Sequence, residues 1–152
     1  MISKTKNSDH RDNQWLLSRL DFIWSKYFVD IHQTNEQVLS SGNKIFIKFG
    51  RFAKYRLGSI RLIKKTGASL ITITAMFKAS SIPKEVVDHT IGHELVHYAH
   101  GFSSVHPRLH RYPHAGGVVR REMSQRGMEH LYESYKKWIK YYRQHLRKIN
   151  GW

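Results

Sequence analysis

The 152-residue sequence predicts an α+β fold in which one helix precedes a small three-stranded sheet and three helices follow it. Two observations support this fold class. Apolar residues recur every three to four positions in four stretches, which is the spacing of helices that bury one face. Between the first and second stretch lie three short runs rich in β-branched residues, and such runs are typical of strands.

The first helix is predicted over residues 13–30. Asp12 or Asn13 is its expected N-cap, because either side chain can accept a hydrogen bond from a first-turn amide. Residues 1–12 are polar and are expected to form a disordered tail. The three strands are expected at 44–49, 55–64 and 70–74, with turn-forming residues between them.

The second helix is predicted to have Ser80 or Ser81 as its N-cap and Pro83 in its first turn. Gly101 is expected to end it, because glycine readily adopts the backbone conformation found just after a helix. The residues expected to face the core are Val86, Val87, Ile91, Leu95 and Ala99.

A loop is predicted at 102–117, followed by a short helix over 118–126 and a long helix over 128–149. We expect residues 13–127 to form the core domain, with the basic and aromatic segment 128–152 packed on it or extending it. The apolar stripe of the long helix is Leu131, Tyr135, Trp138, Tyr142, Leu146 and Ile149.

The second helix contains the sequence His93-Glu94-Leu95-Val96-His97, an HExxH pattern. Histidines four residues apart lie one turn apart on the same helix face, so both imidazoles can bind one metal ion. The glutamate lies farther round the helix, where it can reach a metal-bound water and accept its proton. The pattern predicts one Zn²⁺ per chain, with His93 and His97 as ligands and Glu94 as general base.

A catalytic zinc site needs a third protein ligand, and four histidines follow the motif. His100 lies too close along the same helix to complete the set easily. His106, His110 and His114 all fall in the predicted loop. His114 is preferred because it precedes a glycine pair that leads into the next helix, and His110 is the alternative.

The composition excludes several classes of protein. The chain has no cysteine, which excludes disulfides, a thiol nucleophile and cysteine-ligated metal. It has no apolar run of the roughly 20 residues that a membrane span needs, and its first ten residues lack the apolar core of a signal peptide. We therefore expect a monomeric cytoplasmic protein with no membrane partner.

The chain is strongly basic, with 26 Lys and Arg against 11 acidic residues and a net charge of +15. Between residues 37 and 84 there is no acidic residue. Such a field attracts polyanions, and DNA is the expected partner, with single strands favoured. The expected contacts alternate with aromatics in the last helix, where cations can meet phosphates and aromatics can stack on bases: Lys136, Lys137, Lys140 and Arg143.

The motif and the segment that precedes it, 82–92, resemble the Spartan-related SprT-like zinc metalloproteases, and residues 56–62 and 70–74 are similar to that family's strand region. The resemblance covers about 13–127. It implies a zincin-like metalloprotease core, in which His93, His97 and His114 bind zinc and Glu94 is the general base. It also implies protein substrates associated with DNA, as in the repair of DNA–protein crosslinks, and a nucleoid-associated location if DNA is bound.

In zinc proteases of this architecture, an edge strand near the metal pairs with an extended substrate. The expected strand here is the run Leu70, Ile71, Thr72, Ile73 and Thr74.

Taken together, these features predict a zinc-dependent endopeptidase. The alternative is a basic nucleic-acid-binding module with a structural or inactive metal site. The motif glutamate argues against this alternative, since a structural site needs no general base. A metal-dependent nuclease is less favoured, because the chain lacks the clustered aspartates that Mg²⁺ prefers.

Overall fold

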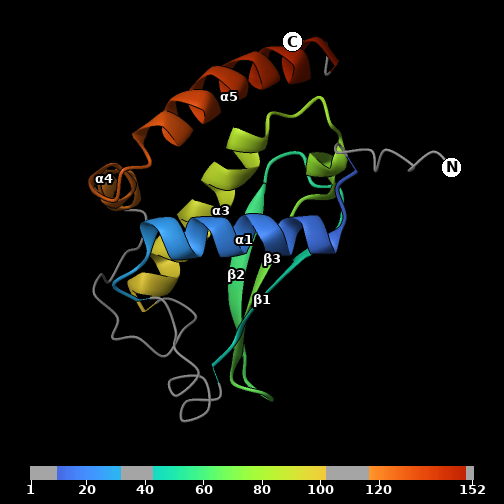
Figure 1. Cartoon of the computed structure of the whole chain (residues 1–152). Helices are drawn as coiled ribbons and strands as arrows, with labels where there is room; N and C mark the ends of the chain where they lie inside the picture. The colour runs from blue at the N-terminus through green and yellow to red at the C-terminus, as the bar shows by residue number, and fades with distance from the viewer. Residues whose placement is uncertain (1–9, 32–42, 102–116, 150–152) are drawn as a thin grey trace, which may run out of the picture.

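The computed structural model describes residues 10–31, 43–101 and 117–149, and it confirms the α+β class (Figure 1). Within these residues, no helix is both long and apolar enough to cross a membrane. The elements in chain order are α1 (Asn13–Tyr27), β1 (Ile45–Phe49), β2 (Gly58–Ile63), β3 (Ala68–Ile73), the 3-10 helix η1 (Ala75–Lys78), α3 (Lys84–Ala99), α4 (Val118–Gln125) and α5 (Glu129–Ile149).

The predicted N-cap is confirmed for α1 and is wrong for α3. Asp12 caps α1 as predicted, and its side chain accepts a hydrogen bond from the Trp15 amide at 2.8 Å. The prediction of Ser80 or Ser81 as cap of the motif helix is wrong, because α3 begins at Lys84 after Pro83. A separate turn, closed by the Ile82 amide on the Ala79 carbonyl, comes first and contains both serines.

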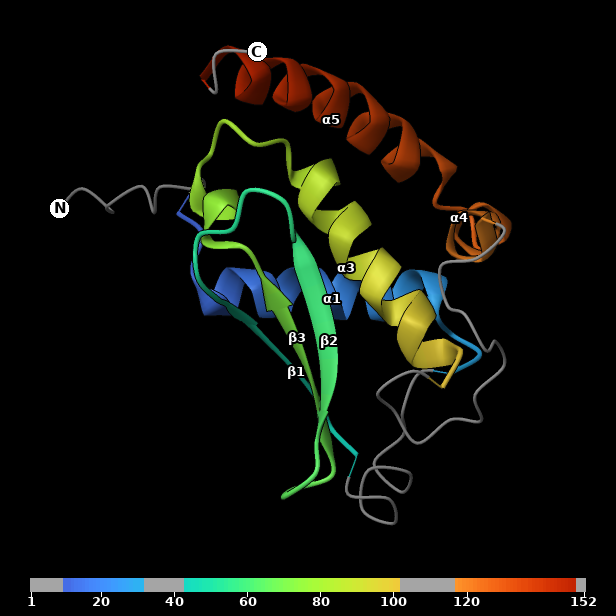
Figure 2. The same cartoon turned by 180° about the vertical axis from the view of Figure 1, so that it is seen from behind.

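The three strands form one mixed sheet in the order β1-β3-β2. Strand β3 is central: it runs parallel to β1 and antiparallel to β2, so that Ile71 lies opposite both Ile47 and Ile60. The prediction that 70–74 is a substrate-binding edge strand is therefore wrong, since both of its sides are already paired. Among the described residues, β2 is the edge strand next to α3, as Figure 2 shows.

Helix α3 lies at the centre of the molecule, in contact with α1, β2, β3, α4 and α5. Of its core-facing predictions, Val86, Val87, Ile91 and Leu95 are fully buried, whereas Ala99 is only partly buried. Gly92 allows the segment between α4 and α5 to pack closely on α3, because a Cβ at position 92 would lie 2.9 Å from the Met128 sulfur.

Helix α5 crosses above α3 and η1 (Figure 1). Leu131 and Leu146 are buried, and the Trp138 ring meets Phe77 of η1 edge-on at 5.6 Å. Tyr142 stacks on Trp138 at 4.8 Å, which confirms that these two aromatics pack on the domain. Ile149, the last residue of the predicted stripe, is exposed.

A buried ion pair joins α1 to α3. The Arg19 guanidinium donates to both carboxylate oxygens of Asp88, at 2.8 and 2.6 Å. The Asp88 side chain is only 4% exposed, so Arg19 provides the charge that compensates for its removal from water. The pair fixes the start of α3 against α1.

Arg19→Ala is expected to destabilise the fold by about 3–5 kcal/mol, because it leaves the Asp88 carboxylate buried without its partner. Denaturant unfolding followed by circular dichroism measures the loss. The matched control is Arg120→Ala, which breaks an ion pair with Glu129 whose two side chains are 47% and 45% exposed and should cost less than about 1 kcal/mol. Equal stability of the two variants would contradict the assignment.

Candidate metal centre

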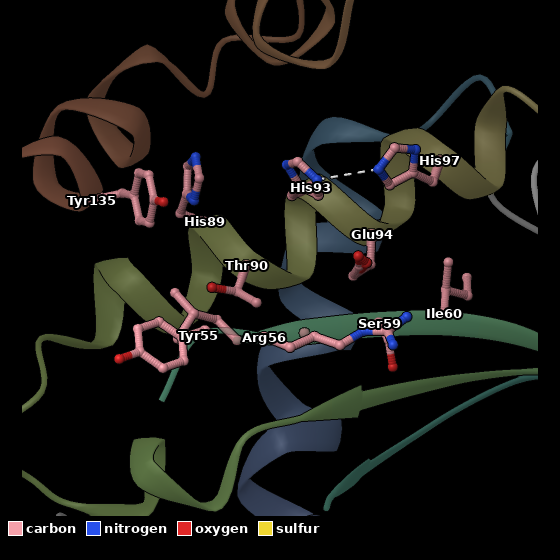
Figure 3. Close-up of a pocket in the computed structure, with 12 residues that line it drawn as sticks. Tyr55, Arg56, Ser59, Ile60, His89, Thr90, His93, Glu94, His97 and Tyr135 are labelled. Carbon is pink, nitrogen blue, oxygen red and sulfur yellow. Dashed lines mark hydrogen bonds between the residues drawn. The ribbon is translucent and has the colours of Figure 1, made fainter. Parts of the chain in front are cut away.

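Helix α3 places His93, Glu94 and His97 on the side that faces β2 and α5 (Figure 3). The predicted one-turn spacing of the histidines is confirmed: the two Nε2 atoms lie 3.1 Å apart. One potential ligand atom from each of the three residues lies within 4.8 Å of the others. Within the described residues, this is the group of histidines and carboxylates that could hold a metal ion.

The two imidazoles could hold a tetrahedral metal ion such as zinc. Two nitrogens that each bond a tetrahedral zinc at about 2.0 Å are separated by about 3.3 Å, close to the observed spacing. Glu94 is buried, and its Oε2 atom has no hydrogen-bond partner among the described residues. A buried carboxylate oxygen without a partner is costly, and a water held between Glu94 and a metal would satisfy it.

The surroundings of Glu94 bring the pKa of its carboxyl close to neutral pH. Burial raises the pKa of the Glu94 carboxyl to about 7, and the positive charge of Arg56 partly opposes the rise. A carboxylate with a pKa near neutrality can both accept and release a proton at the pH of a cell. The protein environment thus suits Glu94 to general base chemistry.

Close approach of β2 to α3 builds the wall opposite the motif. A Cβ at Gly58 would lie 2.6 Å from Thr90 Cγ2 and 3.7 Å from Glu94 Cγ, so only glycine fits without displacing a neighbour. The Thr90 side chain cannot easily give way, because its hydroxyl donates to the Val86 carbonyl at 3.0 Å. Gly58 therefore sets the distance between the edge strand and the motif.

A cavity of about 400 Å³ opens in front of the three motif residues. Residues 55–60 form one wall, α3 forms the floor, and Tyr135 of α5 closes one end (Figure 3). The Tyr135 ring lies flat on His89, with ring centroids 4.2 Å apart and planes 7° apart. Burial lowers the pKa of His89 to about 4, so this imidazole is neutral at physiological pH.

Sequence reasoning found the motif but missed most of this cavity. Arg56, Gly58 and Tyr135 come from parts of the chain far from 93–97, and no local pattern marks them. His89 carried a usable signal, since it lies four residues before His93 and hence on the same helix face.

The third ligand remains a prediction. His100 is buried and contacts Glu122 on α4, with 3.3 Å between Nε2 and Oε1, so it belongs to the packing of α4 on α3. His106, His110 and His114 lie outside the described residues.

The four cations predicted to bind DNA are all exposed on α5, but they do not share one face. Lys136, Lys140 and Arg143 line a hollow formed by α5 residues alone, here called the outer hollow. Lys137 lies on another side, in a groove with Trp138. None of the four lines the cavity in front of the motif.

The site thus combines one helix, one edge strand and one aromatic residue of α5. No family model matches the chain, and no curated protein or solved structure matches it either.

Proposed function

We propose that the protein is a zinc-dependent endopeptidase. The observation that carries this proposal is the arrangement on α3: two histidine nitrogens 3.1 Å apart beside a buried carboxylate whose Oε2 has no partner among the described residues. A purely structural zinc site has its ligands saturated and needs no carboxylate of this kind.

Each residue of the site has a distinct proposed role. His93 and His97 would hold zinc, and His114 is the proposed third ligand. When bound, zinc would act as a Lewis acid that lowers the pKa of a coordinated water to about 7. Glu94 accepts the proton of the attacking water, and it then delivers this proton to the leaving amine.

Strand β2 is the proposed docking edge for the substrate, in place of β3. Residues 55–60 line the cavity, and among the described strands only β3 pairs with β2. An extended peptide that lies in this cavity would run beside β2 and across the motif. Recognition through the backbone implies weak sequence selectivity, which suits a zincin-like core that cleaves varied DNA-associated proteins.

The high positive charge supports the second candidate function, a nucleic-acid-binding module with an inactive metal site. The two candidates agree on metal binding and differ on catalysis. Proteolysis that depends on Glu94 separates them.

The purified protein is expected to hold one zinc ion per chain, and His93→Ala or His97→Ala should lose most of it, because each removes a direct bond to the metal. Elemental analysis after gel filtration measures the zinc content. His130→Ala is the control, since its imidazole contacts Tyr27 on the surface and not the motif. Full zinc occupancy in both motif variants would contradict the site.

Glu94→Gln is expected to retain zinc and fold but to lose at least about a hundredfold in peptidase activity, because an amide cannot accept a proton from water. Casein cleavage, with and without single-stranded DNA, measures the activity. Glu133→Gln removes a carboxylate from the exposed side of α5 and should leave activity unchanged. If Glu94→Gln cleaves within a few-fold of the unmodified protein, the second candidate function is favoured.

The two candidate third ligands are separated by His114→Ala and His110→Ala. We expect His114→Ala to lower zinc content and activity together, while His110→Ala behaves as a surface change. Loss of zinc in His110→Ala alone would move the assignment to that residue.

A further inference from the structure

A second hollow lies on the opposite side of α5 from the outer hollow. This aromatic groove has a volume of about 670 Å³ and runs between α5 and the segment 76–83. Pro83 and Ile82 form one wall, and Trp138, Tyr141 and Tyr142 form the other. The Tyr141 ring is 73% exposed, so it stands at the mouth of the groove without supporting the core.

The groove is held in shape by contacts that are independent of Tyr141. The Tyr142 hydroxyl donates to the Lys54 carbonyl at 2.9 Å, which ties α5 to the chain between β1 and β2. Trp138 is fixed between Phe77 at 5.6 Å and Tyr142 at 4.8 Å. Trp138 and Tyr142 therefore have fixed positions in the groove, and the exposed Tyr141 ring takes no part in these contacts.

Positive charge surrounds the groove. From residue 134 to residue 149 the chain has six Lys or Arg and no acidic residue. Because Tyr142 binds the Lys54 carbonyl, the basic chain between β1 and β2 lies beside this end of α5. The acidic residues nearest to it along the chain, Glu85 and Glu133, do not line the groove.

Cations accompany the exposed ring along α5. Lys137 lines the aromatic groove itself, one turn before Tyr141. Lys140, the residue directly before Tyr141, is exposed and lines the outer hollow with Arg143 and Arg147. An exposed aromatic with cations beside it matches a single-stranded nucleic acid, whose bases can stack on the ring while its phosphates meet the cations.

We propose that this face of α5, with the segment 76–83, binds single-stranded DNA or RNA by base stacking in the aromatic groove. A duplex fits less well, because its bases are already stacked on one another. An acidic protein would use the cations but not the aromatic floor. Tyr135, less than one turn before Trp138, closes the peptidase cavity, so a bound strand would lie next to that cavity.

The inference goes beyond the proposed peptidase function, and it is tested by binding alone. The probe is a fluorescein-labelled 20-nucleotide oligo-dT, whose anisotropy is titrated with the Glu94→Gln protein at several salt concentrations. We expect the logarithm of affinity to fall linearly with the logarithm of salt, by about 0.7 per phosphate contact. A 20-base-pair duplex should bind at least tenfold more weakly at equal salt.

Charge-matched variants locate the contacts. Lys137→Gln/Lys140→Gln should lower the salt slope by about 1.4, because two phosphate contacts are lost. The control, Lys64→Gln/Lys65→Gln, removes the same charge from the turn between β2 and β3, at the far end of the molecule from α5 (Figures 1 and 2), and should keep the slope.

Tyr141→Ala should weaken oligo-dT binding by about five- to a hundredfold through lost stacking, with no change in unfolding midpoint because the ring is exposed. Phe46→Ala, at a half-exposed aromatic on β1, is the control and should bind normally.

Four results would overturn the proposal. Equal losses in the two lysine variants would mean that net charge alone binds the strand. Normal binding by Tyr141→Ala, or equal affinity for the duplex, would remove the stacking site. Stronger binding to polyglutamate or to phosphatidylserine vesicles, lost in the same groove variants, would assign the surface to an acidic protein or a membrane.

Discussion

The rest of the structure depends on the burial of helix α3 on almost every side. Twelve of its sixteen residues are buried, and several of these are polar or titratable. Buried polar groups need partners inside the protein, so neighbouring elements must supply them. Arg19 of α1 pairs with Asp88, and Tyr135 of α5 stacks on His89. The buried Oε2 of Glu94 has no such partner in the described part of the chain, and this residue faces a cavity.

The same burial tunes the candidate site. Removal from water raises the pKa of Glu94 to about 7 and lowers that of His89 to about 4. Both shifts need elements packed closely on α3, and two glycines permit that closeness. Gly58 brings β2 against the motif, and Gly92 brings Met128 against the opposite side of the helix. The contacts that exclude water from α3 therefore also set the pKa values of its buried titratable side chains.

Helix α5 links the two proposed activities. Tyr135 belongs to the wall of the cavity, while the stretch from Lys136 to Arg147 carries exposed cations and one wall of the aromatic groove. Trp138 and Tyr142 anchor this stretch on η1 and on the chain before β2, so the basic surface is held in a fixed position relative to the motif. A single-stranded nucleic acid bound there, and a protein attached to that nucleic acid, would both lie close to Glu94.

The sequence by itself determined the α+β class, the Asp12 cap and the pairing of histidines in 93–97, because helices form through contacts between residues three or four apart. It also located the three strands to within a few residues. Only the tertiary structure decided that 70–74 is the central strand, since strand order depends on pairings between distant segments and leaves no local pattern. For the same reason, only the fold brought Gly58 and Tyr135 to the motif: their roles come from packing between elements, which residue spacing does not encode.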